Sequence, residues 1–162
     1  MSSLNISIDP SLWESGTEAR QHEWRGAMEG LAQGHDVCFR DDLSGLRIER
    51  SEQAFTLVGT DEVGETLETI SVPFDKIADH VHEYVDVVRQ MAKAAPTGSL
   101  ARLEALDMAK KVCHDRAGRT IERACRKLGV DHPTGRRLFT LLVTLKVDTT
   151  RLVGVHGHRR IR

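Results

Sequence analysis

Apolar residues spaced by threes and fours dominate the second half of the chain and predict helices there. After Pro73, which is well tolerated at a helix start, one predicted helix carries an apolar stripe of Phe74, Ile77, Val81, Tyr84, Val88 and Met91. Thr97 or Ser99 is expected to cap a second helix, whose stripe includes Leu100, Leu103, Leu106, Cys113, Ala117 and Ala124. A third run, Leu138 to Val147, is too apolar for a surface and is expected to be buried.

Alternation with a period of two marks the first half and predicts strands. One strand covers residues 4–9, and a helix from Thr17 to about Leu31 follows it. Further strands are expected at Val37–Arg40, around Leu46 and Ile48, around Phe55 and Leu57, and at residues 66–72. Because polar residues alternate through the last strand, we expect an antiparallel sheet that is covered on one side.

These elements predict the α+β class. The expected order is an N-terminal strand and helix, a short antiparallel β-meander and three C-terminal helices packed on the sheet. The 162 residues are enough for one domain. We assign it to residues 1–148 and expect residues 149–162, which contain four arginines and two glycines, to form a flexible basic tail.

The composition is that of a soluble globular protein, with 40% hydrophobic and 29% charged residues. No apolar run is long enough to span a membrane, and the N-terminus shows no export signal. The three cysteines, Cys38, Cys113 and Cys125, lack metal-type or paired spacing. Reduced thiols and a cytoplasmic location are therefore expected.

Charge divides the chain into two parts. Residues 1–88 hold 18 Asp and Glu against 6 Lys and Arg, whereas residues 89–162 hold 6 against 17. The formal charges are thus −12 and +11, and they nearly cancel. The two parts can neutralise each other within the fold, meet between two copies of the chain, or bind an acidic partner.

The sequence contains no known catalytic motif, so histidines beside carboxylates are the remaining candidates for catalysis. His22-Glu23 and His114-Asp115 are such pairs, and a carboxylate can fix the tautomer of a histidine that acts as a base. Adjacent helical residues point about 100° apart, so each histidine needs its partner from another helix. His22, Glu23 and His114 are the catalytic candidates, and ordinary surface or hydrogen-bonded helix residues are the alternative.

A second cluster has metal-type chemistry. Asp79, His82 and Asp86 share one face of the helix after Pro73, opposite its apolar stripe. Such spacing can hold a divalent cation, but it is also typical of a solvated acidic helix face. We predict no cofactor.

Cations crowd the second long helix and the segment after it. The candidate binding residues are Lys110, Lys111, Arg116, Arg119, Arg123, Arg126, Arg136 and Arg137. Phosphate contacts with nucleic acid would use such residues, yet aromatic residues for base stacking are scarce, at 4%. Pairing with the acidic first half of the chain is the alternative.

The residues from Leu106 to Asp115, followed by Arg136 to Leu141, resemble the C-terminal signature of a small bacterial family of uncharacterised proteins. Its pattern reads roughly DMG, a basic residue, RGLHNEGSELLRERL and then RRLFTL. This chain differs at Ala109, where the pattern has glycine, and at Asp115-Arg116, where it has Asn-Glu. The resemblance implies a bacterial cytosolic protein and carries no activity.

We interpret the sequence as that of a non-enzymatic binding or scaffold protein that acts through its acidic and basic parts. The expected partner is a second copy of the chain, as in a homodimer, or another protein. A metal- or histidine-dependent hydrolase and a nucleic-acid-binding protein are the alternatives.

Overall fold

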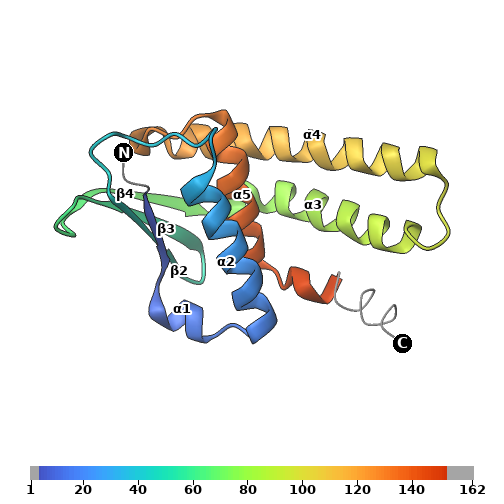
Figure 1. The fold of residues 1–162 in the computed structure, drawn as a ribbon, viewed down its shortest axis with the longest axis horizontal. Coiled ribbons are helices and arrows are strands. Elements are labelled where there is room, and N and C mark those ends of the chain that lie inside the picture. Colours follow the sequence, from blue (N-terminus) through green and yellow to red (C-terminus); the bar gives the residue numbers. More distant parts are fainter. Residues whose placement is uncertain (1–3, 153–162) are drawn as a thin grey trace.

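A computed structural model describes residues 4–152 as a four-stranded sheet, a layer of helices and a projecting helical hairpin (Figure 1). The strands are β1 (Asn5–Ile8), β2 (Gly45–Arg50), β3 (Ala54–Thr60) and β4 (Thr66–Pro73). The helices are α1 (Pro10–Glu14), α2 (Glu18–Gln33), α3 (Phe74–Ala94), α4 (Leu100–Ala124), the short 3-10 helix η1 (Arg126–Leu128) and α5 (His132–Lys146). The predicted α+β class is confirmed.

The sheet is mixed, with the strand order β1-β2-β3-β4. The expected antiparallel meander is confirmed in β2, β3 and β4, and the N-terminal strand β1 adds a parallel edge by pairing with β2. The intervening helices α1 and α2 carry the chain back to the start of β2, which a parallel pair requires. Ile8, Ile48, Leu57 and Ile70 form one buried row across all four strands.

The predicted strand at Val37–Arg40 was wrong. Its backbone lies against the helices instead: the Arg40 amide donates to the Leu128 carbonyl at 2.9 Å. The Cys38 amide donates to the Thr134 hydroxyl at 2.6 Å. These bonds satisfy the segment's polar groups without a sheet partner.

Helix starts follow the predicted caps. Thr17 and Ser99 each accept a hydrogen bond from the backbone amide three residues later, at the starts of α2 and α4. Asp131 does the same at the start of α5, which was not predicted, because α5 begins at His132, before the apolar run from Leu138. Pro73 precedes α3 as expected. Helix α1 was not predicted; it is one turn long and has Pro10 at its first position.

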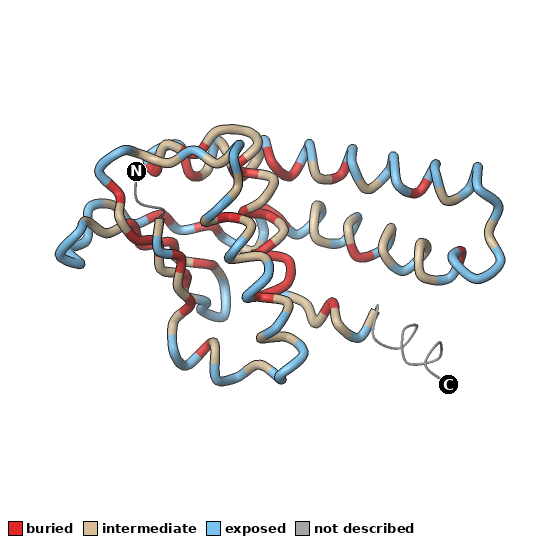
Figure 2. Tube along the Cα trace, viewed as in Figure 1, coloured by how far each residue is buried: buried red, intermediate tan, exposed pale blue. Residues whose placement is uncertain are grey.

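The core lies where α5 crosses between the sheet and the other helices, and buried segments concentrate there (Figure 2). Leu138, Phe139 and Leu142 of α5 are fully buried, which confirms that the apolar run is a core element. Trp24 of α2 is also fully buried, and its indole N–H donates to the Thr144 carbonyl at 2.9 Å. Helices α2 and α5 are therefore joined by both packing and a buried hydrogen bond.

Helices α3 and α4 run antiparallel, and their far ends extend beyond the sheet (Figure 1). The C-terminal half of α4 packs on α5, whereas its N-terminal half has only α3 beside it. Of the predicted basic tail, Thr149 is buried and its hydroxyl donates to Glu23. Residues 153–162 lie outside the described part of the chain.

Candidate functional site

Two glycines bring α4 and α5 into close contact. A Cβ atom on Gly135 would collide with the Gly118 carbonyl oxygen, and a Cβ on Gly118 would lie 2.5 Å from Arg136 Cγ. The absence of a side chain at both positions is what allows the two backbones to come this close. This crossing brings His114 of α4 beside Phe139 and Thr140 in the middle of α5.

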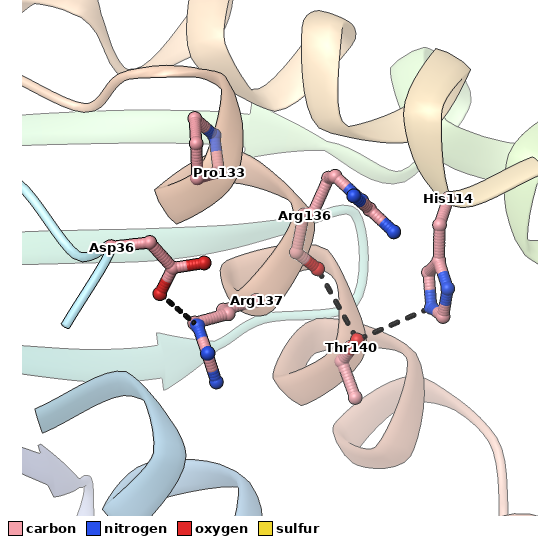
Figure 3. A pocket seen from close by; sticks show the side chains of 6 residues that line it. All are labelled: Asp36, His114, Pro133, Arg136, Arg137 and Thr140. Atoms are coloured by element: carbon pink, nitrogen blue, oxygen red, sulfur yellow. Dashed lines mark hydrogen bonds and ion pairs between the residues drawn. The ribbon is translucent and has the colours of Figure 1, made fainter. Parts of the chain in front are cut away.

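A pocket of about 210 Å³ opens at this crossing (Figure 3). It is lined by Asp36, His114, Pro133, Arg136, Arg137 and Thr140. Asp36 comes from the loop after α2, His114 from α4 and the rest from α5, so three separate segments form the walls.

Each arginine of the pocket is held by a carboxylate at its Nε atom. Arg137 Nε lies 2.8 Å from Asp36 Oδ1, and this hydrogen bond holds the pKa of Asp36 below its usual value. Arg136 Nε lies 3.4 Å from Asp115 Oδ1. The backbone carbonyl of Asp115 in turn lies 3.0 Å from His132 Nε2.

His114 is partly buried among other side chains. Its Nε2 lies 3.3 Å from the Thr140 hydroxyl, and its ring packs on Tyr84 at 5.2 Å between centroids. Burial, and then the charges of Lys110 and Arg136, lower the pKa of His114 to about 4. The imidazole is therefore neutral at pH 7 and can donate one hydrogen bond and accept another.

The other catalytic candidates are arranged differently. Burial, followed by the nearby Glu23 carboxylate, raises the pKa of Tyr84. His114 packs on the Tyr84 ring, whereas Glu23 accepts a hydrogen bond from the Thr149 hydroxyl. His22 is exposed and lines a different cavity of about 630 Å³ together with Glu18 and Arg25. No hydrogen bond joins it to His114 within residues 4–152. The structure does not assemble the predicted pair of histidine–carboxylate dyads in a common cleft.

The buried cysteines do not supply an ionised thiol. Burial raises the pKa of Cys113 to about 11 and that of Cys125 to about 12. Both side chains are therefore protonated at neutral pH. Asp79, His82 and Asp86 are exposed on α3, and no group of three metal-ligating side chains converges within the described residues.

The candidate binding cations fall into two sets. Lys111 pairs with Asp107 and Arg116 with Glu83, while Lys110 lies over the Tyr84 ring and the two pocket arginines pair as described above. Arg119, Arg123 and Arg126 are exposed and form no ion pair within residues 4–152. Arg116 and Arg137 thus pair with carboxylates of the acidic part of the chain, and Lys111 and Arg136 with carboxylates of the basic part itself. The remaining arginines of this set face solvent.

Sequence reasoning missed Asp36 and Thr140 as pocket residues. Thr140 lies one helical turn after Arg136, so its position on the same face of α5 could have been noticed. Asp36 gave no local signal, because only the packing of its loop against α5 brings it to Arg137.

The comparison with known families identifies the chain. Residues 3–148 match the model of an uncharacterised protein family, UPF0262. The chain belongs to the UPF0262 family. This confirms the resemblance seen in the sequence, and the family has no assigned activity.

Bacterial relatives share most of the chain. A UPF0262 protein of Brucella anthropi is 25% identical over 147 residues, which cover 88% of this chain and 91% of the relative. A UPF0262 protein of Novosphingobium aromaticivorans is 29% identical over 117 residues, which cover 70% of each chain. No solved structure matches this UPF0262 chain. None of the helices within residues 4–152 is both long and apolar enough to cross a membrane.

Proposed function

We propose that this UPF0262 protein is a non-catalytic binding protein that docks a second protein surface on one charged face of its α3–α4 hairpin. The occupant that charge and geometry favour is a second copy of the chain. The observation that carries the proposal is the side-by-side arrangement of an acidic and a basic stripe on that face.

The acidic stripe consists of Asp79, Glu83 and Asp86 on α3, and the basic stripe of Arg116, Arg119 and Arg123 on α4. Each has three-four spacing, so each occupies one side of its helix. All six residues are exposed. The ion pair between Arg116 Nη1 and Glu83 Oε2, at 3.4 Å, makes the two stripes neighbours across the seam of the hairpin.

This face is complementary to itself. A two-fold axis along the hairpin would lay α3 of one copy over α4 of the other at the same height. His80 and Glu83 of α3 lie level with Thr120 and Arg116 of α4. Asp79 would therefore face Arg119, with Arg123 about one turn further along, and Asp86 would lie about one turn from Arg116. The same contacts would occur twice, as in any isologous dimer. Helical geometry also turns Met108 and Val112 toward this side of α4, and their exposed fractions of 60% and 41% supply apolar area.

The test is light scattering coupled to gel filtration, with two double variants. Arg119→Glu/Arg123→Glu makes both stripes acidic, and Asp79→Lys/Asp86→Lys makes both basic. The wild type is expected to dimerise at about 50 mM salt and dissociate at about 500 mM, because salt screens exposed charges. Each double variant alone should be monomeric, and an equimolar mixture should form a heterodimer.

Glu62→Lys/Glu65→Lys in the exposed β3–β4 turn is the matched control, because it changes the net charge as much as the α3 variant does. It should dimerise like the wild type. A wild type that is monomeric at low salt, or a mixture that does not associate, would refute the proposal. If the monomer instead binds a polyanion through Arg119 and Arg123, the nucleic-acid alternative replaces it.

A further inference from the structure

We propose that the pocket between α4, α5 and the loop at Asp36 binds a phosphate group, either free phosphate or a small phosphate monoester. The pocket involves none of the stripe residues Asp79, Asp86, Arg119 and Arg123. The proposal therefore does not depend on self-association of the hairpin.

Unused hydrogen-bond donors are the first support for this site. A guanidinium carries five N–H bonds in a planar fork that suits phosphate oxygens. Arg136 uses Nε on Asp115, and its two terminal nitrogens make no hydrogen bond within residues 4–152. Arg137 uses Nε on Asp36 and Nη1 weakly, at 3.4 Å, on the Gly30 carbonyl, which leaves Nη2 free in the same part of the chain. Three terminal guanidinium nitrogens therefore remain for a ligand.

The carboxylates of the site hold the arginines in position without consuming those donors. Asp36 and Asp115 each contact the Nε edge of one guanidinium. A side chain fixed before binding loses less conformational freedom when the ligand arrives. The close approach of α4 and α5 at Gly118 also restricts the Arg136 side chain, because its Cγ atom packs directly over that glycine.

His114 and Thr140 complete the wall with neutral groups. Figure 3 shows the His114 ring and the Thr140 hydroxyl facing each other on the side of the pocket opposite Asp36. Burial, and then the charges of Lys110 and Arg136, keep the pKa of His114 low, so its ring is neutral beside the arginines. The Thr140 hydroxyl donates to the Arg136 carbonyl at 3.2 Å and lies 3.3 Å from His114 Nε2. These two groups therefore fix the wall of the pocket without adding charge, and the arginines supply the donors for phosphate.

The volume sets the size of the ligand. About 210 Å³ corresponds to roughly seven water molecules at about 30 Å³ each. Phosphate or a short monoester fits this space. A nucleotide would need most of its base and sugar to lie outside it.

The experiment is calorimetric titration of the wild-type chain with three probes: inorganic phosphate, glycerol phosphate and succinate. Phosphate or glycerol phosphate is expected to bind, and succinate to bind at least about tenfold more weakly because its carboxylates are planar and singly charged. Tighter binding of glycerol phosphate than of phosphate would identify a monoester as the natural form, and the reverse would identify the free ion.

Arg136→Gln is the main variant, because glutamine keeps the Cγ atom that packs on Gly118. It should weaken phosphate binding at least about tenfold, as expected for the loss of charge-assisted hydrogen bonds. Thr140→Val removes the hydroxyl at nearly constant volume and should weaken binding to a smaller degree. Arg119→Gln, which removes an exposed arginine of α4 outside the pocket, should bind as the wild type does.

Thermal unfolding of each variant verifies that it is folded. If neither phosphate nor glycerol phosphate binds the wild type, or if Arg136→Gln and Arg119→Gln weaken binding equally, the site is refuted. Stronger binding of succinate would refute the phosphate class. Failure of dimerisation leaves these outcomes unchanged, since the two experiments use different residues.

Discussion

The two halves of α4 belong to one continuous helix but have different surroundings. From Cys113 to Ala124 the helix packs on both α3 and α5, and Ala117, Gly118 and Ile121 are buried. From Leu100 to Val112 only α3 lies alongside, and Leu100 and Met108 are 73% and 60% exposed. The difference shows that a crossing helix, more than the composition of α4 itself, decides which half belongs to the core. Local unfolding should accordingly begin in the outer half.

Truncating one apolar side chain in each half should give the largest contrast. Ile121→Ala removes a fully buried side chain and is expected to lower the free energy of unfolding by about 2–5 kcal/mol. Met108→Ala, in the outer half, should change it by less than about 0.5 kcal/mol. Urea unfolding followed by circular dichroism measures both. Equal losses would mean that the outer half is packed as tightly as the inner one.

Adding a methyl group at the α4–α5 crossing should have a somewhat smaller effect. Gly135→Ala forces a Cβ atom against the Gly118 carbonyl and is expected to cost about 1–3 kcal/mol. Gly26→Ala in α2 is the matched control, because no atom lies within 4 Å of its added Cβ. Alanine should stabilise that position by about 0.5–1 kcal/mol. Thermal unfolding measures both changes in stability. Changes of opposite sign would establish that α4 and α5 touch at Gly135, and changes of the same sign would contradict it.

A smaller, pH-dependent effect should come from His114, at the boundary between the two halves. The unfolded chain takes up a proton on this histidine near its ordinary pKa of 6.5, whereas the folded chain does so only at about 4. The unfolded state therefore binds more protons in this interval. The contribution of His114 to the stability of the folded state is full above about pH 6.5 and falls as the pH drops toward 4.

Unfolding measured at several pH values should show this loss in the wild type and a flatter profile in His114→Asn. His82→Asn, which removes an exposed histidine of α3, is the control and should follow the wild-type profile. A His114→Asn profile as steep as that of the wild type would mean that a group other than His114 causes the loss of stability at low pH.

The difference between local patterns and long-range packing also explains which elements could be predicted from the sequence. The apolar stripe from Phe74 to Met91 and the Ser99 cap were recognisable because helix periodicity and caps are local properties. The strand predicted at Val37–Arg40 was wrong because a four-residue apolar segment does not reveal whether its partner is a strand or, as here, Leu128 and Thr134. The parallel pairing of β1 likewise depends on long-range packing.

The candidate site was predictable only in part for the same reason. His114, Arg136 and Arg137 were singled out by their residue types and by the resemblance to the family pattern. Asp36 joins them across about a hundred residues of sequence, through one hydrogen bond to Arg137. No pattern within a single helix or loop encodes such a contact.

The far end of the α3–α4 hairpin has a practical consequence. Residues 95–99 join the two helices there, and Ala95, Pro96 and Thr97 are exposed. Exposed turns of this kind tolerate inserted sequence well. An epitope or a fluorescent reporter placed after Pro96 would sit away from both the sheet and the pocket, so the protein could be followed in living cells with its interior intact.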